Sequence, residues 1–173
     1  MDLLKKNRPD RPACLILDVR MPGVNGMELQ HELAQTGIRI PIIFITAHGD
    51  IPMSVRAIKS GATEFLTKPF RSRTLLNAVR MAIDQDLSAR KSRSEIEALR
   101  GRYKRLTPRE REVLPLVVGG LLNKQAAAHL GISEITLQIH RTNVMRKMAA
   151  QSLADLVRMA GALEIPVTLA RRS

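Results

Sequence analysis

One stretch, residues 15–26, constrains the fold of this chain more than any other. An apolar run ends there in a single carboxylate, Asp18, and is followed by a tight turn at Met21-Pro22-Gly23 and a helix start at Asn25-Gly26. A short apolar run bounded by turn residues predicts a buried strand. Open α/β sheets carry their chemistry at the carboxyl ends of strands, where this pattern puts Asp18. The alternative interpretation is that Asp18 only caps a turn.

Strand and helix patterns alternate through the first half of the chain. This order predicts a parallel sheet with right-handed crossovers. The last helix of the series carries an apolar stripe at Leu76, Val79, Ile83 and Leu87. Residues 2–7 resemble the tail of a further helix. We expect strands over residues 13–17, 41–45 and 64–67, and helices over residues 26–35, 51–60 and 72–87.

The second half of the chain has helix signals only. Thr107, Pro108 and Glu110 form a capping-box pattern that opens a helix ending at Val118. Asn123 is expected to cap a helix over residues 124–130, and Ser133 one over 134–148. A last helix is predicted over residues 152–162. The short turn at residues 131–133 makes the middle pair a helix-turn-helix, with one extra helix on each side.

A charged segment, residues 88–105, joins the two halves. Its stripe of Ile96, Leu99 and Tyr103 indicates that at least part of it is helical. It is interpreted either as a solvated spacer or as a helical rod or dimer seam. We therefore predict a partial α/β domain over residues 1–86, a charged helical linker over 87–101, and an all-α four-helix domain over 102–167.

The net charge of +12 is unevenly distributed along the chain. Residues 1–88 contain 12 Lys and Arg against 9 Asp and Glu, whereas residues 89–173 contain 16 against 7. A basic excess indicates a polyanionic partner. Aromatic residues, which a single-strand platform needs for stacking, are scarce, so double-stranded DNA is the expected partner. The single cysteine and the lack of any long apolar run predict a cytoplasmic protein with no membrane partner.

Asp18, Thr46 and Lys68 each fall at the end of one predicted strand. The carboxyl ends of parallel strands meet at one edge of a sheet, so we expect these three side chains to converge. A cis Lys68–Pro69 bond would aim the ammonium inward. A phosphoryl acceptor needs a nucleophilic carboxylate, donors for the phosphoryl oxygens and a divalent cation. The ordered set therefore points to phosphoryl transfer onto Asp18.

This half of the chain resembles the receiver domain of two-component response regulators. The resemblance rests on Asp18-Val-Arg-Met-Pro-Gly, Ile45-Thr-Ala47 and Leu66-Thr-Lys-Pro-Phe70. It implies a flavodoxin-like fold and phosphorylation of Asp18 by a sensor histidine kinase. It also implies a switch hydroxyl on Thr46, a phosphate-binding ammonium on Lys68 and a rotating aromatic ring at Phe65. Mg²⁺ would be held by Asp18 and the backbone carbonyl of Arg20.

The chain departs from the receiver pattern before Asp18. A receiver has a strand, a helix and a strand there, and its first strand ends in a pair of acids that hold Mg²⁺. Asp10 lies at the wrong end of the predicted strand, and Asp50 lies in a loop that enters another helix. We therefore expect an incomplete, N-terminally truncated receiver with an incomplete Mg²⁺ site and poor or absent phosphorylation. The acceptor strand is expected to form an exposed edge of the sheet.

A helical wheel divides the helix over residues 134–148 into two faces. Leu137, His140, Val144 and Met148 are predicted to pack inward, and Ile135, Ile139, Thr142 and Arg146 to project outward, with Gln138 on the flank. Such an outward face suits a major groove, because Gln can pair with adenine and Ile or Thr can contact a thymine methyl. Phosphate contacts are predicted for Lys124, Thr136, Arg146 and Lys147. For Arg141, a phosphate contact and an ion pair with Glu110 or Glu112 stay equally open.

The second half resembles the LuxR-type helix-turn-helix, and the whole chain resembles a FixJ-type regulator. The matching motifs are Leu106-Thr-Pro-Arg-Glu-Arg-Glu-Val-Leu114, Asn123-Lys-Gln-Ala-Ala127, Gly131-Ile-Ser133 and Thr136-Leu-Gln-Ile-His-Arg-Thr-Asn143. The resemblance implies a homodimer on DNA. The dimer seam would be formed by Leu153, Leu156 and Val157. The same apolar stripe also suits the domain core, and we expect both interpretations to hold in part.

The expected function is a DNA-binding transcriptional regulator of a phosphorelay, which is not an enzyme and whose partners could include RNA polymerase. The alternative is an interaction module that titrates a kinase or dimerises with an intact regulator. A gel shift on genomic fragments separates the two hypotheses.

Overall fold

The computed structural model of the chain describes residues 10–21, 24–47, 49 and 51–168, which fall into two compact units. The sheet unit comprises Met1–Lys91 and the helical unit Ser92–Ser173. The domain boundaries drawn from the sequence stay predictions. The helix expected over residues 2–7 and the turn residues Pro22 and Gly23 lie outside the described residues. No helix in the described ranges is long and apolar enough to cross a membrane.

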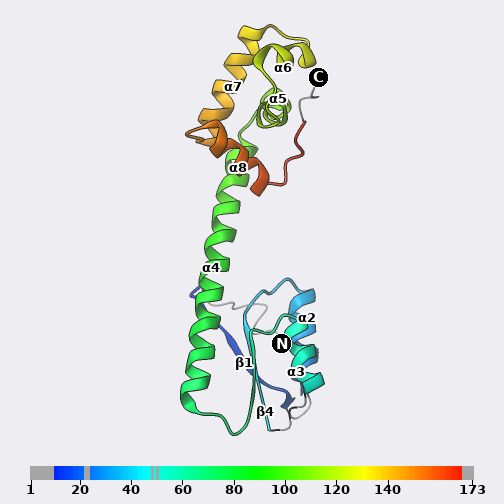
Figure 1. The fold of residues 1–173 in the computed structure, drawn as a ribbon, viewed down its shortest axis with the longest axis vertical. Helices are drawn as coiled ribbons and strands as arrows, with labels where there is room; N and C mark the ends of the chain where they lie inside the picture. The colour runs from blue at the N-terminus through cyan, green and yellow to red at the C-terminus, as the bar shows by residue number, and fades with distance from the viewer. Residues whose placement is uncertain (1–9, 22–23, 48, 50, 169–173) are drawn as a thin grey trace. The chain divides into compact units, whose positions relative to one another are not determined.

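The sheet unit is built on three parallel strands in the order β1-β4-β5 (Figure 1). These are β1 (Leu15–Asp18), β4 (Ile42–Thr46) and β5 (Glu64–Thr67). A small antiparallel pair, β2 (Arg20–Met21) with β3 (Val24–Asn25), follows β1 and was not predicted. The parallel sheet and the position of β1 at its edge confirm the expected topology, and Ile16 of β1 is exposed as expected of such an edge.

Alternating side chains of β4 divide the core of the sheet unit into two layers. Phe44 packs with residues of α2 (Gly26–Gln35) and α3 (Ile51–Lys59), whereas Ile43 packs with Ala78 and Ala82 of α4 (Ser72–Lys104). Figure 1 shows α2 and α3 on one side of the sheet and α4 on the other. Both faces of the central strand are therefore covered, which explains why its sequence is apolar throughout.

The start of α2 is fixed by residues of the opening motif. Asn25 Oδ1 accepts a hydrogen bond from the backbone N–H of Met27, which caps the helix. A Cβ atom at Gly26 would come within 2.7 Å of the carbonyl oxygen of Asp18. Only glycine therefore lets α2 begin directly beside the end of the acceptor strand.

Helix α4 differs from its prediction in length and in buried face. It is one continuous helix of 33 residues, whereas the sequence predicted an end at Leu87 and a partly helical linker beyond it. Leu76 and Leu87 of the predicted apolar stripe are exposed. The face buried in the sheet unit is instead formed by Ala78, Ala82 and Asp86, because small alanines let the helix lie close to the sheet.

The carboxylate of Asp86 can occupy this buried face because it is paired and hydrogen-bonded. It is almost fully buried, and its Oδ2 accepts hydrogen bonds from the backbone N–H of Ala13 at 3.0 Å and from Arg90 Nε at 2.7 Å. Buried charge is tolerated when it is paired and hydrogen-bonded in this way. Arg90 lies one turn along α4, so this pair also supports the helix where it was expected to end.

The helical unit contains α5 (Pro108–Val118), α6 (Asn123–Leu130), α7 (Glu134–Met148) and α8 (Leu153–Ala162) around one apolar core. The Thr107–Glu110 capping box and the Ser133 cap confirm their predictions, and Gly131 ends α6 with a φ of 63°. The cap predicted at Asn123 is wrong. Asn123 is the first residue of α6, and Gln125 Oε1 accepts the backbone N–H of Leu122, which holds the cap position.

Candidate phosphoryl-acceptor site and nucleic-acid interface

The three residues predicted to converge at the end of the sheet lie together there. Lys68 Nζ donates a hydrogen bond to Asp18 Oδ2 at 2.8 Å, across strands β1 and β5 that are separated by β4. The backbone N–H of Lys68 donates to the carbonyl oxygen of Thr46 at 2.7 Å. The Lys68–Pro69 peptide bond is cis. The sheet therefore assembles a carboxylate, a hydroxyl residue and a cation at one edge.

The Asp18 carboxylate is accessible and ionised. The hydrogen bond from Lys68, followed by that from the backbone N–H of Arg20, holds the pKa of the Asp18 carboxyl below its ordinary value. Both partners of the Asp18–Lys68 pair remain partly exposed to solvent. A charged, reachable carboxylate beside an ammonium is chemically suited to accept a phosphoryl group, whose oxygens the ammonium would stabilise.

Thr46 and Phe65, the two predicted switch residues, lie in closely packed surroundings. Thr46 is almost fully buried, and the ring of Phe65 lies 6.4 Å from that of Phe44. A Cβ atom at Gly49 would approach side-chain atoms of Thr67, Phe65 and Thr46 to within 3.0 Å or less. The sequence analysis did not single out Gly49, although a glycine in the loop after a strand can signal such a close approach.

The described residues do not fit a resident Mg²⁺ ion. Asp18 supplies one carboxylate, and both of its oxygens already accept hydrogen bonds from Lys68 and Arg20. No group of three or more His, Cys, Asp or Glu side chains in the described ranges could hold a metal ion. Asp50, the weak candidate ligand, lies outside the described residues, and Asp10 precedes β1 rather than following it. Mg²⁺ prefers near-octahedral oxygen ligation, which this donor set does not provide.

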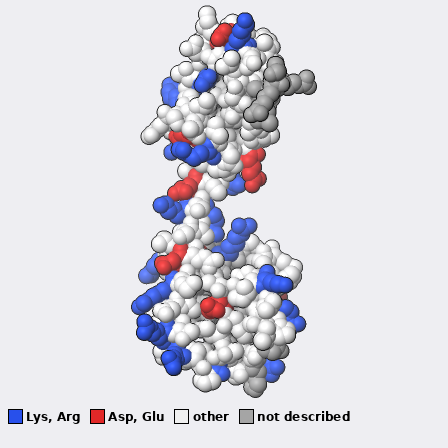
Figure 2. All heavy atoms as spheres, viewed as in Figure 1, with Lys and Arg blue, Asp and Glu red and all other residues white. Residues whose placement is uncertain are grey.

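Charged side chains are spread over the visible face of both units (Figure 2). Figure 2 shows Lys and Arg side chains spread over the visible face, with only scattered Asp and Glu.

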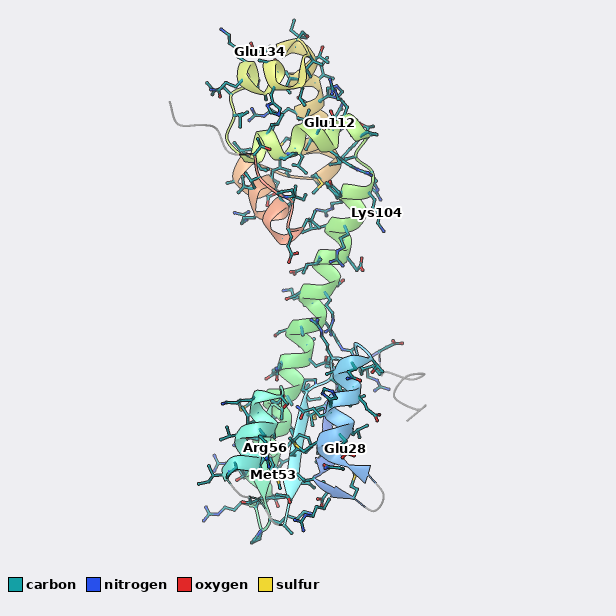
Figure 3. All side chains as sticks on the ribbon, turned by 90° about the vertical axis from the view of Figure 1, so that its right-hand side faces the viewer. Glu28, Met53, Arg56, Lys104, Glu112 and Glu134 are labelled. Carbon is teal, nitrogen blue, oxygen red and sulfur yellow. The ribbon has the colours of Figure 1, made fainter. Side chains whose placement is uncertain are left out.

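A shallow depression in the sheet unit is lined by Val19, Arg20, Met21, Asn25 and Met53. Figure 3 labels Met53 and Arg56 on α3 and Glu28 on α2. This depression adjoins the strand end that carries Asp18.

Helix α7 has the two faces that the wheel predicted. Leu137, Val144 and Met148 are fully buried, and His140 is half-buried. On the outward face Ile135 is 74% exposed and Ile139 is 57% exposed. A shallow groove runs along this face and is lined by Ile135, Gln138, Ile139, Thr142 and Asn143. The domain core thus fixes one side of α7 and leaves an apolar and hydrogen-bonding side in solvent.

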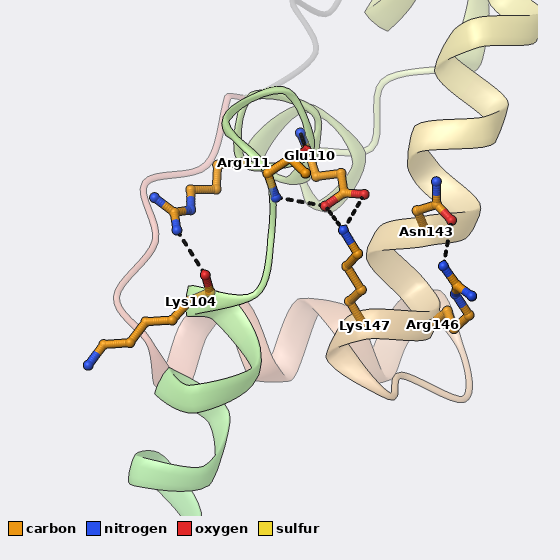
Figure 4. Close-up of polar contacts among 7 residues, drawn as sticks. Lys104, Glu110, Arg111, Asn143, Arg146 and Lys147 are labelled. Carbon is orange, nitrogen blue, oxygen red and sulfur yellow. Dashed lines mark hydrogen bonds and ion pairs between the residues drawn. The ribbon is translucent and has the colours of Figure 1, made fainter.

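The ammonium of Lys147, for which a phosphate contact was predicted, is paired inside the helical unit. Its ammonium donates to both carboxylate oxygens of Glu110, at 2.7 and 2.9 Å (Figure 4). Glu110 is almost fully buried on α5. Burial opposes ionisation, but the hydrogen bonds from Lys147 and the backbone of Thr107 outweigh it, so the pKa of the Glu110 carboxyl is below its ordinary value. The predicted phosphate role of Lys147 is therefore corrected to an internal ion pair.

The pairing of Lys147 also bears on the ion pair that was one of the two interpretations of Arg141. Glu110 pairs with Lys147 and Glu112 with Arg109, so the ion-pair interpretation of Arg141 is wrong. Arg141 Nη1 donates instead to Asn123 Oδ1 at 2.8 Å. A sequence signal for the buried pair existed, because Glu110 shares one helical face with the apolar Val113, Leu114 and Val117. A carboxylate on such a face needs a cation.

The apolar stripe of α8 divides between core and surface. Leu156 is fully buried and belongs to the core of the helical unit, so its assignment to a dimer seam is corrected. Leu153 and Val157 are exposed. The predicted phosphate-contacting residues Lys124 and Arg146 are exposed as well, and Arg146 donates to Asn143 Oδ1 at 3.2 Å.

Comparison with known proteins identifies the class of this chain. Residues 1–80 match the response regulator receiver domain, and residues 104–160 match the bacterial regulatory proteins of the luxR family. The chain therefore belongs to the two-component response regulators with a LuxR-type DNA-binding domain. These are regulators of transcription rather than enzymes, which confirms the predicted class.

Individual relatives narrow the assignment to the FixJ type. The chain is 52% identical to "Nodulation protein W" of Bradyrhizobium diazoefficiens, over 95% of this chain and 72% of that protein. It is 45% identical to "Transcriptional regulatory protein FixJ" of Rhizobium meliloti, over 88% and 75% of the two chains. The solved structure of the response regulator StyR matches with a TM-score of 0.77 and 47% identity, over 92% and 81% of the two chains.

Proposed function

We propose that this protein regulates transcription by binding duplex DNA through the exposed face of α7, as the output of a phosphorelay with a sensor histidine kinase. The observation that carries this proposal is the exposure of Ile135 and Ile139 on a helix whose opposite face buries Leu137, Val144 and Met148. Exposed isoleucines cost free energy in water, and a thymine methyl in a major groove would cover them. The name of the relative FixJ, a transcriptional regulatory protein, supports the same role.

The residues of the groove on α7 divide the readout between them. Gln138 presents an amide that can donate to and accept from one adenine edge. We assign contacts with thymine methyl groups to Ile135, Ile139 and the methyl of Thr142. The Thr142 hydroxyl donates to the carbonyl oxygen of Gln138, so its methyl is the part left for contact. We therefore expect Gln138 to contribute most to the preference for particular DNA sequences.

Phosphate contacts are assigned to three residues of α6 and α7, of which Lys124 and Arg146 are exposed and Thr136 is half-buried. Lys124 lies in the first turn of α6 and Arg146 in the last turn of α7. Thr136 lies in the first turn of α7, with its hydroxyl 2.7 Å from that of Ser133. Such contacts fix the register of a protein on DNA and carry no sequence information. Lys147 is not among them, because its ammonium is held by Glu110.

The test is a gel shift on genomic fragments at roughly physiological salt. The chain should select a subset of fragments over bulk DNA. Gln138→Ala should relax that selection, whereas Lys124→Ala should weaken binding to all fragments alike. Lys59→Ala on α3 is the matched control, because it removes an exposed lysine from the sheet unit. Binding that shows no selection over bulk DNA, or selection unchanged by Gln138→Ala, would contradict the assignment.

We propose further that the chain binds DNA as a homodimer through Leu153 and Val157, which are exposed next to the buried Leu156. RNA polymerase is the expected downstream partner of such a regulator. Replacing both exposed residues with serine should leave folding intact and abolish the dimeric complex on DNA in sedimentation experiments. Dimeric complexes that survive both replacements would place the seam elsewhere.

For the receiver half we propose that this 173-residue polypeptide accepts phosphate poorly or not at all. Support comes from the single carboxylate at Asp18 and from the poor fit of the described residues to Mg²⁺. Incubation with acetyl phosphate and Mg²⁺, followed by mass spectrometry, should give no stoichiometric phosphoryl adduct. A stoichiometric adduct that Asp18→Ala abolishes would refute this proposal and would leave the DNA-binding assignment untouched.

A second candidate function is an interaction module that titrates a kinase or pairs with an intact regulator. The observation that favours it is the position of β1 at the edge of the sheet with Ile16 exposed, because an edge strand offers unpaired backbone groups to another chain. This candidate predicts partner binding without selective DNA binding. The gel shift described above therefore separates the two functions.

A further inference from the structure

The C-terminal end of α7 is held by an arginine of another helix, α4. Helix ends leave their last carbonyl groups without partners inside the helix. Two of these in α7 are satisfied locally, since the backbone N–H groups of Ala149 and Ala150 donate to Arg146 and Met145. The carbonyl of Met148, the final helical residue, instead accepts a hydrogen bond from Arg102 Nη1 at 3.2 Å. Arg102 belongs to α4, so the bond joins residues 46 positions apart.

The chemistry of this contact favours the anchored arrangement. A guanidinium at the C-terminus of a helix interacts favourably with the negative end of the helix dipole. Arg102 is half-buried, which weakens screening by solvent. Asp155 of α8 lies near it: the backbone N–H of Gln151 chiefly lowers the pKa of Asp155, and Arg158 and Arg102 add to that effect. Arg102 therefore lies where α4, α7 and α8 meet inside the helical unit.

The last turn of α4 is itself held in place, so Arg102 can act as a fixed anchor. Tyr103 packs against the core of the helical unit, and the guanidinium of Arg111 lies 5.5 Å from the centre of its ring. Arg111 Nη2 also donates to the carbonyl oxygen of Lys104 at 3.1 Å (Figure 4). These contacts tie the end of α4 to α5.

The last turn of α7 is thus held from two sides. Lys147 reaches from it to Glu110 on α5, and Arg102 reaches to it from α4. The same turn carries Arg146, the exposed residue assigned to a phosphate contact. The match to the luxR family begins at residue 104, so Arg102 lies outside it.

We propose that Arg102 is a positioning residue for DNA binding, which holds the C-terminal turn of α7, and with it Arg146, from the end of the helix that links the two units. This inference deepens the proposed function and rests on α7 being the DNA-reading helix. Arg102 acts through α7 and makes no DNA contact. It follows that the recognition unit includes the last turn of α4.

The test compares two arginines on the same helix of the full chain. Arg102→Ala removes the anchor. Arg100→Ala is the matched control, since Arg100 is exposed and forms an ion pair at 3.9 Å with Glu97 on the same helix. Both variants lose one positive charge. The readouts are amide hydrogen exchange at Ala149 and Ala150, and the Kd for a mixed-sequence duplex at low salt.

Arg102→Ala should accelerate exchange at Ala149 and Ala150 and raise Kd by about tenfold, which corresponds to the low end of the range for one charge-assisted hydrogen bond. Exchange at Leu137 and the Kd of Arg100→Ala should stay close to wild type. Weaker DNA binding without faster exchange would mean that Arg102 touches DNA itself and would overturn the proposal. Identical behaviour of the two variants would overturn it too. Wild-type protein that binds no duplex would refute the proposed function instead.

A general loss of folding in Arg102→Ala would be recognised by faster exchange throughout the helical unit. Arg102→Lys then decides, because it keeps a cation and a donor at the same place on α4. Exchange at Ala149 and Ala150 between that of wild type and Arg102→Ala, with a partly restored Kd, would support positioning. Wild-type exchange at both residues combined with lost DNA affinity would overturn it.

Discussion

Two carboxylate–lysine pairs, one in each unit, have nearly the same geometry and different surroundings. Asp18 and Lys68 lie 2.8 Å apart at the end of the sheet, and Glu110 and Lys147 lie 2.7 Å apart between α5 and α7. The side chains are 31% and 42% exposed in the first pair, but 4% and 26% exposed in the second. Distance alone therefore does not separate an accessible reactive carboxylate from a structural one, whereas burial does.

The difference has a physical basis. Water competes for the charges of the exposed pair, so the pair is weak and Lys68 can readily change its partner. The buried Glu110 has lost its hydration and depends on Lys147 and the backbone of Thr107. The first pair can therefore change partners at low cost, whereas the second holds α7 against α5.

The two pairs should differ most in how much stability is lost when the lysine is removed. Lys147→Met should lower the free energy of unfolding of the helical unit by about 2–3 kcal/mol, because it leaves the buried Glu110 carboxylate without its cation. Tyr103, the only tyrosine in a chain without tryptophan, packs on this core, so its fluorescence during urea unfolding measures the effect. Lys68→Met should leave the far-UV circular dichroism transition unchanged. Equal losses of stability in the two variants would contradict the claim that burial makes the Glu110–Lys147 pair structural.

Controls within the helical unit sharpen this result. Lys124→Ala removes an exposed lysine and should not shift the Tyr103 transition. The double variant Glu110→Leu with Lys147→Met should be less destabilised than Lys147→Met alone, because both charges are then removed together. A double variant that is the less stable of the two would show that packing rather than charge dominates at this position.

A smaller contrast is expected on acidification. The pKa of Glu110 in the folded protein lies below its ordinary value of 4.5. The stability that this group contributes is therefore fully present above about pH 4.5, and is lost as pH falls through the lower folded pKa. In the wild type, the urea midpoint followed by Tyr103 fluorescence should fall between about pH 6 and pH 3, and Glu110→Gln should make this fall smaller. The same pH dependence of the midpoint in wild type and Glu110→Gln would contradict a contribution of the Glu110 carboxylate to stability.

The smallest contrast is expected with salt. The pKa of the Asp18 carboxyl is also lowered, chiefly by the hydrogen bond from Lys68, but this pair is exposed. Raising the ionic strength from about 0.01 M to about 1 M shortens the Debye length from about 30 Å to about 3 Å. The pKa of Asp18, followed by NMR titration of its side chain, should move back toward its ordinary value, and that of Glu110 should change less. A larger shift for Glu110 would mean that burial does not screen its pair from salt.

The fold and the acceptor site were predictable because the evidence for them is local or follows from topology. The helix bounds of α2, α5 and α7 agree with the capping and turn residues that predicted them. Asp18 and Lys68 are 50 residues apart, yet the rule that parallel strands end at one edge brings them together. The length and buried face of α4 were missed, because alanines and a paired aspartate do not form an apolar stripe.

The roles of individual charges in the helical unit were less predictable. The sequence identified Lys147 as basic and near the end of a helix, which suits a phosphate contact and an ion pair equally well. Which of them holds depends on Glu110, 37 residues earlier and on another helix. The same limit applies to Leu156, whose burial between packed helices cannot be distinguished from a dimer seam by spacing alone.

The sequence by itself determined the order of the three parallel strands and the main helices, the two faces of α7 and the convergence of Asp18, Thr46 and Lys68, because periodicity and strand ends are properties of the local chain. Only the tertiary structure decided that Lys147 is engaged by Glu110, that Asp86 is buried beside Ala13, and that Arg102 holds the end of α7. These contacts join helices and strands whose packing angle and separation are set by the core. The partner of a charged side chain therefore becomes defined only when the elements are packed together.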